Sequence, residues 1–255
     1  MTMRDGEDTL EAKLKPEYFF DLSNFEHKEL FEGKNYVWEA LIALPAYMEK
    51  IVPHKLAEYD FRDDSTARIH ETAVIGPEVY IGKGTVVGPY AVIEGPTIIG
   101  DNNIIQNKAH IRGNVVTGPH TRIGNTEVVN SILLGGIGPK KDQMSHFAHR
   151  NYIGYSIMGK GVILGAAVTT ASLRGDWKPI NVYVEGKKYE TGLGQFGVVM
   201  GDNSFTGCGL TLNPGTLIGK DCFIHNIHHL KSGFIPSNRE VRNKDLSYDI
   251  KDRNL

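Results

Sequence analysis

Hydrophobic residues recur at every sixth position along the middle of the chain. From residue 69 to residue 129, each of these positions holds a β-branched residue. They are Ile69, Ile75, Ile81, Val87, Ile93, Ile99, Ile105, Ile111, Thr117, Ile123 and Val129. A second column, two residues earlier, is mostly small and runs from Ala67 to Glu127. A period of six fits neither an α-helix nor a continuous alternating strand, so it predicts short strands with a corner after each repeat, three of which close a triangular coil of about 18 residues.

The six-residue register is interrupted twice. It breaks after Val129, returns at Met158, and breaks again until Met200. The interruptions, about residues 134–151 and 173–197, are rich in glycine and polar residues, and the second also carries aromatic residues. Insertions into a solenoid map to loops that often carry function, although they can also be tolerated decoration. We therefore predict a β-solenoid over residues 67–230 with two inserted loops.

The segments that flank the repeats have different compositions. Residues 37–52 (VWEALIALPAYMEKIV) predict an amphipathic helix bent at Pro45, preceded by several aromatic residues. We interpret residues 1–66 as an N-terminal helical cap, because the open end of a solenoid exposes strand edges that need cover. Residues 231–255 are polar and predict a solvated or partner-wrapping tail.

Composition and charge limit the possible partners. The chain has 255 residues, 40% of them hydrophobic, which is enough for a sizeable core and excludes a disordered chain. The formal net charge is −2, so no global basic field is available to attract nucleic acid or an anionic membrane, and any phosphate site must be local. The chain begins with polar residues and contains no apolar stretch as long as a membrane span. With only two cysteines, it is expected in the cytoplasm.

Residues 149–154 (HRNYIG) form the most specific motif. With the coil that follows, SIMGKGVILGAAVTTASLR at 156–174, the motif resembles the acetyltransferase domain of N-acetylglucosamine-1-phosphate uridyltransferase. The likeness is closer to the related sugar-1-phosphate nucleotidyltransferases whose C-terminal β-helix acetylates amino-sugar phosphates, which share the longer loop before residues 194–219. It covers about residues 67–226. The resemblance implies an all-β fold, the left-handed parallel β-helix of hexapeptide repeats, and a homotrimer with sites between subunits.

The resemblance also implies roles for individual residues. In that family the pattern His-x-x-Tyr-hydrophobic-Gly supplies a general base and a tyrosine that contacts the sugar phosphate, here His149 and Tyr152. An amine that attacks an acetyl thioester must lose a proton, and imidazole is suited to accept it. Arg112 and Lys178 match family positions that bind the phosphate, a role for which arginine and lysine are both suited.

Acetyl-CoA is the co-substrate that the resemblance implies. Ala166, Ala167 and Cys208 match positions where small side chains leave room for the acyl donor and backbone N–H groups can stabilise the thioester oxyanion. We therefore expect these three residues to bind the cofactor. As plain corner residues of the β-helix they would have no such role.

Three substrate positions depart from the family pattern. Asn130 replaces a lysine, Ile163 replaces an asparagine that helps bind the amino sugar, and Ser172 stands where an asparagine is usual before the second loop. Ser172 is nevertheless expected to lie at the substrate. The retained histidine with altered binding residues indicates either a different amino sugar or a scaffold that has lost activity.

The nucleotidyltransferase domain of the family is not expected here. Residues 1–66 contain no GGxGTR-type loop and are too short for a Rossmann-like sheet, so a separate nucleotidyltransferase could act as a partner. We predict an acetyl-CoA-dependent N-acetyltransferase acting on an amino-sugar phosphate or nucleotide sugar. The alternative is a non-catalytic β-helix that binds nucleotide sugars or a partner enzyme.

Histidines raise a third alternative, a zinc hydratase of the carbonic-anhydrase type. One zinc family with this fold gathers three histidines from neighbouring coils, and a zinc site needs such converging donors. Seven of the ten histidines fall in or beside the repeats. They are His110, His120, His146, His149, His225, His228 and His229. Because the sequence does not show convergence, we predict no metal ligands.

Overall fold

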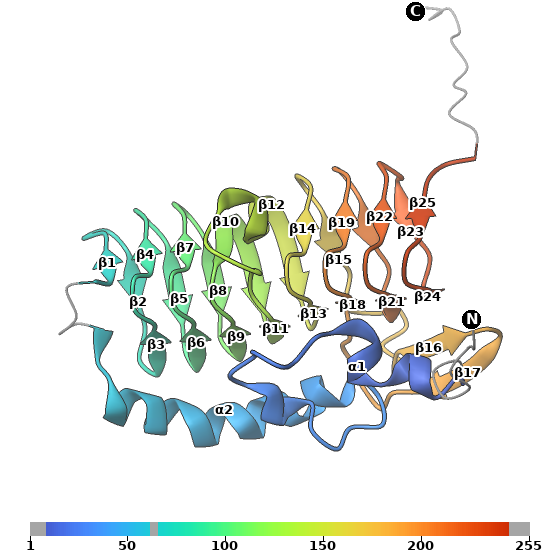
Figure 1. Cartoon of the computed structure of the whole chain (residues 1–255), viewed down its shortest axis with the longest axis horizontal. Helices are drawn as coiled ribbons and strands as arrows, with labels where there is room; N and C mark the ends of the chain where they lie inside the picture. Colours follow the sequence, from blue (N-terminus) through green and yellow to red (C-terminus); the bar gives the residue numbers. More distant parts are fainter. Residues whose placement is uncertain (1–8, 62–65, 245–255) are drawn as a thin grey trace, which may run out of the picture.

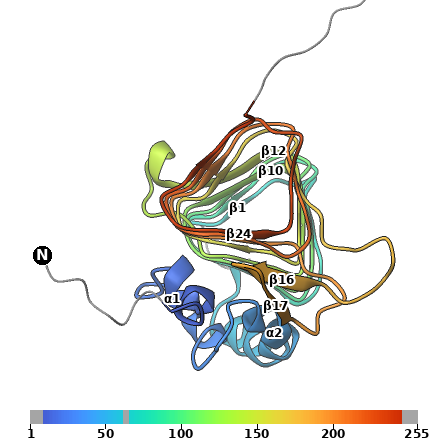
Figure 2. The same cartoon turned by 90° about the vertical axis from the view of Figure 1, so that its right-hand side faces the viewer.

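A computed structural model describes residues 9–61 and 66–244 of the chain. The repeats wind into a triangular solenoid in which strands of successive coils pair in parallel (Figures 1 and 2). This stack of triangular parallel coils confirms the predicted left-handed parallel β-helix. An N-terminal helical segment lies outside the solenoid and runs alongside it, parallel to its long axis (Figure 1).

Each coil contributes a strand to each of three sides, which we call the first, second and third side. The first side contains β1 (Arg68–Ile69), β4 (Val86–Val87), β7 (Ile104–Ile105), the first half of β10 (Thr121–Val129), the first half of β12 (Ser145–Gly154), β14 (Ile163–Leu164), β19 (Phe205–Thr206), β22 (Phe223–Ile224) and β25 (Glu240–Val241). The second side contains β2 (Val74–Ile75), β5 (Val92–Glu94), β8 (His110–Arg112), the second halves of β10 and β12, β15 (Thr169–Thr170), β20 (Thr211–Leu212) and β23 (His229–Leu230). The third side contains β3 (Val79–Ile81), β6 (Thr97–Ile99), β9 (Val115–Thr117), β11 (Ser131–Leu133), β13 (Ile157–Met158), β18 (Val198–Met200), β21 (Thr216–Ile218) and β24 (Gly233–Ile235).

The predicted aliphatic column fills the interior of the solenoid, except at one coil. Ile105, Ile111 and Ile123 are fully buried in one continuous core. In the next position Val128 is buried instead of the predicted Val129. The cause is that β10 continues through a corner with a shift of register between Asn125 and Glu127, which shortens the repeat there by one residue.

The N-terminal segment, residues 9–61, lies along the third side (Figure 2). It contains η1 (Ala12–Leu14), α1 (Pro16–Phe19), η2 (Lys28–Leu30) and α2 (Glu39–Glu58), and α2 extends the helix predicted over 37–52. Its buried residues form one core with the outward side chains of the third side. Those outward residues are Ile98, Val116, Ile132, Ile157, Val199 and Leu217. The segment thus covers a side of the solenoid, whereas we had expected residues 1–66 to cover an end; residues 1–8 and 62–65 lie outside the described residues.

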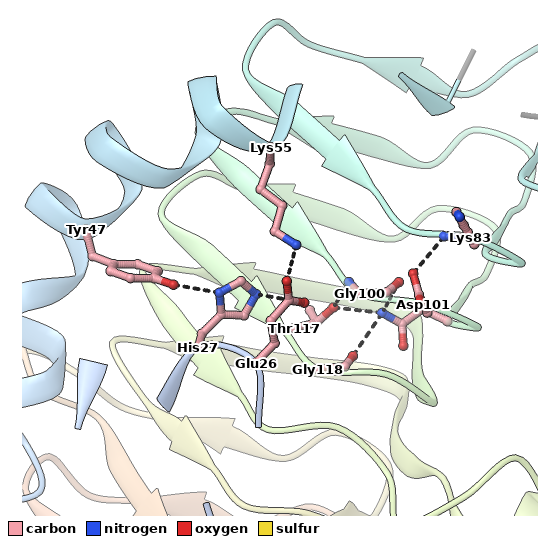
Figure 3. Close-up of polar contacts among 10 residues, drawn as sticks. Glu26, His27, Tyr47, Lys55, Lys83, Gly100, Asp101, Thr117 and Gly118 are labelled. Carbon is pink, nitrogen blue, oxygen red and sulfur yellow. Dashed lines mark hydrogen bonds and ion pairs between the residues drawn. The ribbon is translucent and has the colours of Figure 1, made fainter. Parts of the chain in front are cut away.

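Polar contacts fasten the N-terminal segment internally (Figure 3). The Nδ1 atom of His27 lies 2.7 Å from the hydroxyl of Tyr47 on α2, and Glu26 forms an ion pair with Lys55. The His27 side chain is only 2% exposed, and this burial lowers its pKa to about 4. Burial likewise raises the pKa of Tyr47 to about 12.

The N-terminal segment reaches both ends of the solenoid. Near the last coils, Glu17 accepts a hydrogen bond at its carbonyl from Lys220, and the hydroxyl of Tyr18 accepts one from the backbone of Ser237. At the first coil, the Nζ of Lys55 lies 4.9 Å from the ring centre of Tyr80. The segment therefore spans the whole stack.

The inserted loops and the C-terminal part differ from the prediction in extent. Residues 145–154 form β12, so only the part before it, which contains η4 (Lys141–Gln143), leaves the solenoid. The second loop, predicted over 173–197, contains an antiparallel hairpin of β16 (Asn181–Val184) and β17 (Lys187–Glu190) that also packs against the third side. In the segment predicted as a tail, 231–255, β24 and β25 continue the solenoid to Val241, and residues 245–255 lie outside the described residues.

Candidate active site

His149 stands at the corner where the first side turns into the second. β12 crosses this corner with Arg150 in the left-handed region at φ 52°, and His149 pairs with Asn125 of β10. Asn151 is 4% exposed and fixes the turn. Its Oδ1 accepts a hydrogen bond from the backbone N–H of Val168 at 2.8 Å, and its backbone N–H donates one to the hydroxyl of Thr126 at 3.2 Å. The buried asparagine thereby leaves His149 exposed at the rim.

A groove of about 490 Å³ runs past His149. We call it the His149 groove; it is lined by Gln106, Asn107, Asn125, Ala148, His149, Arg150 and Ala166. The sequence motif identified only two of these residues, His149 and Ala166. Asn107 and Asn125 each follow an interior isoleucine by two positions, in successive coils. Equivalent positions of neighbouring coils lie side by side, so this spacing in the sequence could have identified both residues.

The three residues predicted to bind acetyl-CoA lie on the same corner as His149. The N–H of Ala167 donates to the carbonyl of His149 at 2.8 Å. In the next coil, the Sγ of Cys208 lies 3.2 Å from the backbone nitrogen of Ala166. The structure thus brings Ala166, Ala167 and Cys208 together with His149 along one edge.

Arg112 and Tyr152 lie on the second side. The guanidinium of Arg112 donates a hydrogen bond to Glu127 at 2.6 Å, and the contact with this carboxylate raises the pKa of Arg112. Glu127 is also the strand partner of Tyr152. The six-residue period predicts Glu127 in the small interior column. The register shift in β10 turns Glu127 outward instead, where its carboxylate balances the charge of Arg112.

Ser172 and Lys178 follow β15 at the corner between the second and third sides. Ser172 is 6% exposed, and its carbonyl accepts a hydrogen bond from the backbone of Phe196 at 2.9 Å. Lys178 is exposed in the loop before β16. Among residues 9–61 and 66–244, no hydrogen bond or ion pair joins either side chain to His149 or Tyr152. In one copy of the chain, Ser172 and Lys178 thus lie at a different corner of the solenoid from His149.

Asn130 and Ile163, the other two departures from the family pattern, lie on different parts of the solenoid. Asn130 occupies the left-handed region at φ 44° between β10 and β11, where its N–H donates to the carbonyl of Gly113. Ile163 points outward on the first side and pairs with His146. These residues present an amide and an aliphatic surface where the family has a lysine and an asparagine.

The described part of the chain contains no candidate metal site and no candidate membrane-spanning helix. Within it, no three or more His, Cys, Asp or Glu side chains are grouped so that they could hold a metal ion. No helix among residues 9–61 and 66–244 combines the length and apolar character that a membrane span needs.

Known proteins with similar sequences support the resemblance drawn from the motif. No protein-family model matches the chain. The bifunctional protein GlmU of Methanocaldococcus jannaschii is 37% identical over 188 residues, which cover 73% of this chain and 41% of the relative. The bifunctional sugar-1-phosphate nucleotidylyltransferase/acetyltransferase of Sulfurisphaera tokodaii is 30% identical over 112 residues, which cover 44% of this chain and 26% of the relative. The predicted resemblance to this group is therefore confirmed in sequence, for a chain that spans well under half the length of these relatives.

A solved structure with a similar arrangement is the UDP-N-acetylglucosamine acyltransferase of Francisella novicida. It aligns with a TM-score of 0.39 at 18% sequence identity, covering 70% of this chain and 62% of that one.

Proposed function

We propose that the protein is an acetyl-CoA-dependent N-acetyltransferase that acts in the cytoplasm on an amino-sugar phosphate or a nucleotide sugar. The observation that carries the proposal is the placement of His149, exposed in a groove and aligned along one solenoid edge with Ala166, Ala167 and Cys208. The similarity to two bifunctional relatives, one named as an acetyltransferase, supports the same reaction class.

The proposed reaction is acyl transfer from sulfur to nitrogen. The amine of the acceptor attacks the thioester carbonyl, a C–N bond forms, and His149 accepts the proton that the amine loses. The oxyanion of the intermediate collapses, the C–S bond breaks, and coenzyme A leaves as a thiol after taking up a proton. Donation from the backbone N–H of Ala166 to the oxyanion would require this N–H to leave the Sγ of Cys208, its acceptor at 3.2 Å.

Phosphate binding in this proposal involves more than one copy of the chain. Arg112 and Tyr152 on the second side would contact the acceptor phosphate, with Arg112 exchanging Glu127 for the ligand. Ser172 and Lys178 lie at another corner, so they would serve the His149 groove of a neighbouring copy in a homotrimer. Asn130 and Ile163 favour an acceptor other than the one usual in the family.

Release of free thiol tests the proposed reaction. The purified chain is mixed with acetyl-CoA and, in turn, with glucosamine 1-phosphate, galactosamine 1-phosphate and their nucleotide sugars. The matching N-acetylated sugars, which lack the free amine, serve as controls. We expect thiol release only with a free amine, together with an acetylated product by mass spectrometry. Absence of thiol release with every acceptor, with no binding of acetyl-CoA, would refute the proposal.

A binding or scaffold protein is the second candidate, and one observation favours it. Arg112, the cation expected to bind the substrate phosphate, already forms an ion pair with Glu127. A scaffold would bind a nucleotide sugar or a partner nucleotidyltransferase without turnover. Binding of a nucleotide sugar with no thiol release would support this candidate.

Cys208 gives an independent prediction about the acyl donor. Cys208 is exposed, whereas Cys222 is 2% exposed and burial raises the pKa of its thiol. N-ethylmaleimide is therefore expected to label the folded chain once, at Cys208, and acetyl-CoA, whose sulfur is acylated and does not react with the reagent, is expected to slow labelling in proportion to the fraction of sites it occupies. Mass spectrometry measures the rate, and Cys208→Ser is the control that should stay unlabelled until unfolded. Labelling of Cys208 at an unchanged rate in saturating acetyl-CoA would contradict its place beside the donor.

A further inference from the structure

Arg122 lies on β10, the strand that also carries Asn125 of the His149 groove. It occupies the outward row of the first side, between Ile104 of β7 and His146 of β12. Its Nε is buried and makes no hydrogen bond, and no ion pair to its guanidinium is found in the described part of the chain. Arg112 is the opposite case, because Glu127 balances it. A buried donor without an acceptor is unfavourable, so an anion that binds to the Arg122 side chain could supply the missing acceptor.

Lys141 and His146 lie next to Arg122 on this side of the solenoid. The Nε2 of His146 donates to the carbonyl of Lys141 in η4 at 2.7 Å, which holds the short helix against the first side. Burial lowers the pKa of His146, the hydrogen bond to the Lys141 carbonyl opposes this effect, and the charges of Arg122, Lys141 and His149 lower the pKa further. The strand partners on either side of the pair, Ile104 and Ile163, bring no negative charge.

We propose that the guanidinium of Arg122 forms a second anion site that binds a phosphate ester of one of the substrates. This inference rests on the proposed function. A guanidinium can bind phosphate oxygens in pairs, which suits a site built around one arginine. The residues from His146 to His149 follow one strand, so the site lies about 10 Å from the base at a rise of about 3.3 Å per residue. The phosphate could belong to the sugar acceptor or to coenzyme A, both of which extend beyond the reacting atoms.

Isothermal titration calorimetry of the full chain tests the site. Inorganic pyrophosphate is the probe, followed by CoA, glucosamine 1-phosphate and UDP-N-acetylglucosamine. Arg122→Gln is expected to weaken pyrophosphate and one substrate by about 10- to 100-fold, the loss typical of a hydrogen bond to a charged group. The phosphate-free compounds pantetheine and glucosamine should be unaffected. The substrate that loses affinity identifies the source of the phosphate.

Arg68→Gln is the matched control. Arg68 begins the same outward row in the first coil, away from the groove, so its replacement removes the same charge without touching the site. Arg122→Lys should keep part of the affinity. Unchanged affinities in Arg122→Gln would overturn the inference. It would also be overturned if that variant lost affinity for pantetheine and glucosamine, or changed its mass by light scattering, because Arg122 would then have a structural or subunit-contact role.

The pyrophosphate titration separates this inference from the proposed reaction. It requires no turnover, so an affinity that depends on Arg122 in a chain without acetyl transfer would keep the anion site and refute the reaction. Acetyl transfer with affinities independent of Arg122 would refute the anion site alone.

Discussion

Replacing His149 by asparagine is expected to lower kcat for acetyl transfer by about 10²- to 10⁴-fold, the usual contribution of a general base. Binding should change little, because the imidazole makes no hydrogen bond to another side chain within residues 9–61 and 66–244 and lies exposed at the rim of the groove. The fold should persist for the same reason, since the buried Asn151 and not His149 fixes the corner. Steady-state kinetics gives the rate, and calorimetry with CoA gives the affinity.

His70→Asn provides the matched control for this experiment. His70 follows β1 at the same corner in the first coil, where its Nδ1 lies 2.9 Å from the hydroxyl of Thr72. Its loss should leave kcat unchanged. If His149→Asn retained wild-type kcat, or lost activity together with CoA binding, His149 would not be the base.

Acidification is expected to destabilise the N-terminal segment through His27. Burial lowers the pKa of His27 from 6.5 to about 4, an effect that Glu26 opposes and Lys55 reinforces. The unfolded chain therefore binds a proton that the folded chain does not, so stability present above pH 6.5 is lost as the pH falls towards 4. At about 1.4 kcal/mol per pH unit, the full loss is on the order of 3 kcal/mol. The Glu26 carboxylate acts in the same direction, because Lys55 lowers its pKa despite its burial.

Tryptophan fluorescence can follow this loss during urea unfolding. Trp38 is 1% exposed in the layer over the third side, whereas Trp177 is 77% exposed, so Trp177→Phe leaves one reporter of the segment. We expect the unfolding free energy to fall between pH 6.5 and 4 by about 3 kcal/mol more with His27 than with His27→Gln. Equal losses in the two proteins would show that His27 is not the group responsible.

The solenoid could be predicted from sequence because every coil repeats the same physical requirement. Each interior position must be filled by a side chain of suitable size, so Ile105 and Ile123 satisfy one rule at different coils. The partner of the helical segment could not be predicted from the segment itself. An apolar helix face must be buried, but it does not show which surface buries it. That surface is formed by Ile98, Val116 and Leu217, outward residues that precede interior residues at every third repeat.

The lining of the His149 groove could be predicted where it depended on the local motif, whereas contacts that depend on the strand register could not be predicted. His149 and Ala166 could be identified because the motif fixes their types and their order along the corner. The pairing of Arg112 with Glu127 could not, because a strict period of six directs Glu127 inward. A shift of one residue within β10 reverses the direction of every side chain that follows until the next corner.

The N-terminal segment, which touches the coils near Ser237 as well as the coil of Tyr80, changes how the repeats are expected to unfold. In an ordinary repeat array each unit senses only its neighbours, and the ends fray independently. Here, opening either end removes contacts with a segment that also supports the other, so the array should melt as one cooperative unit. During synthesis the segment emerges before the coils that complete its surface. Contacts of such large sequence separation form late, and full cooperativity is expected only after the last coil has closed.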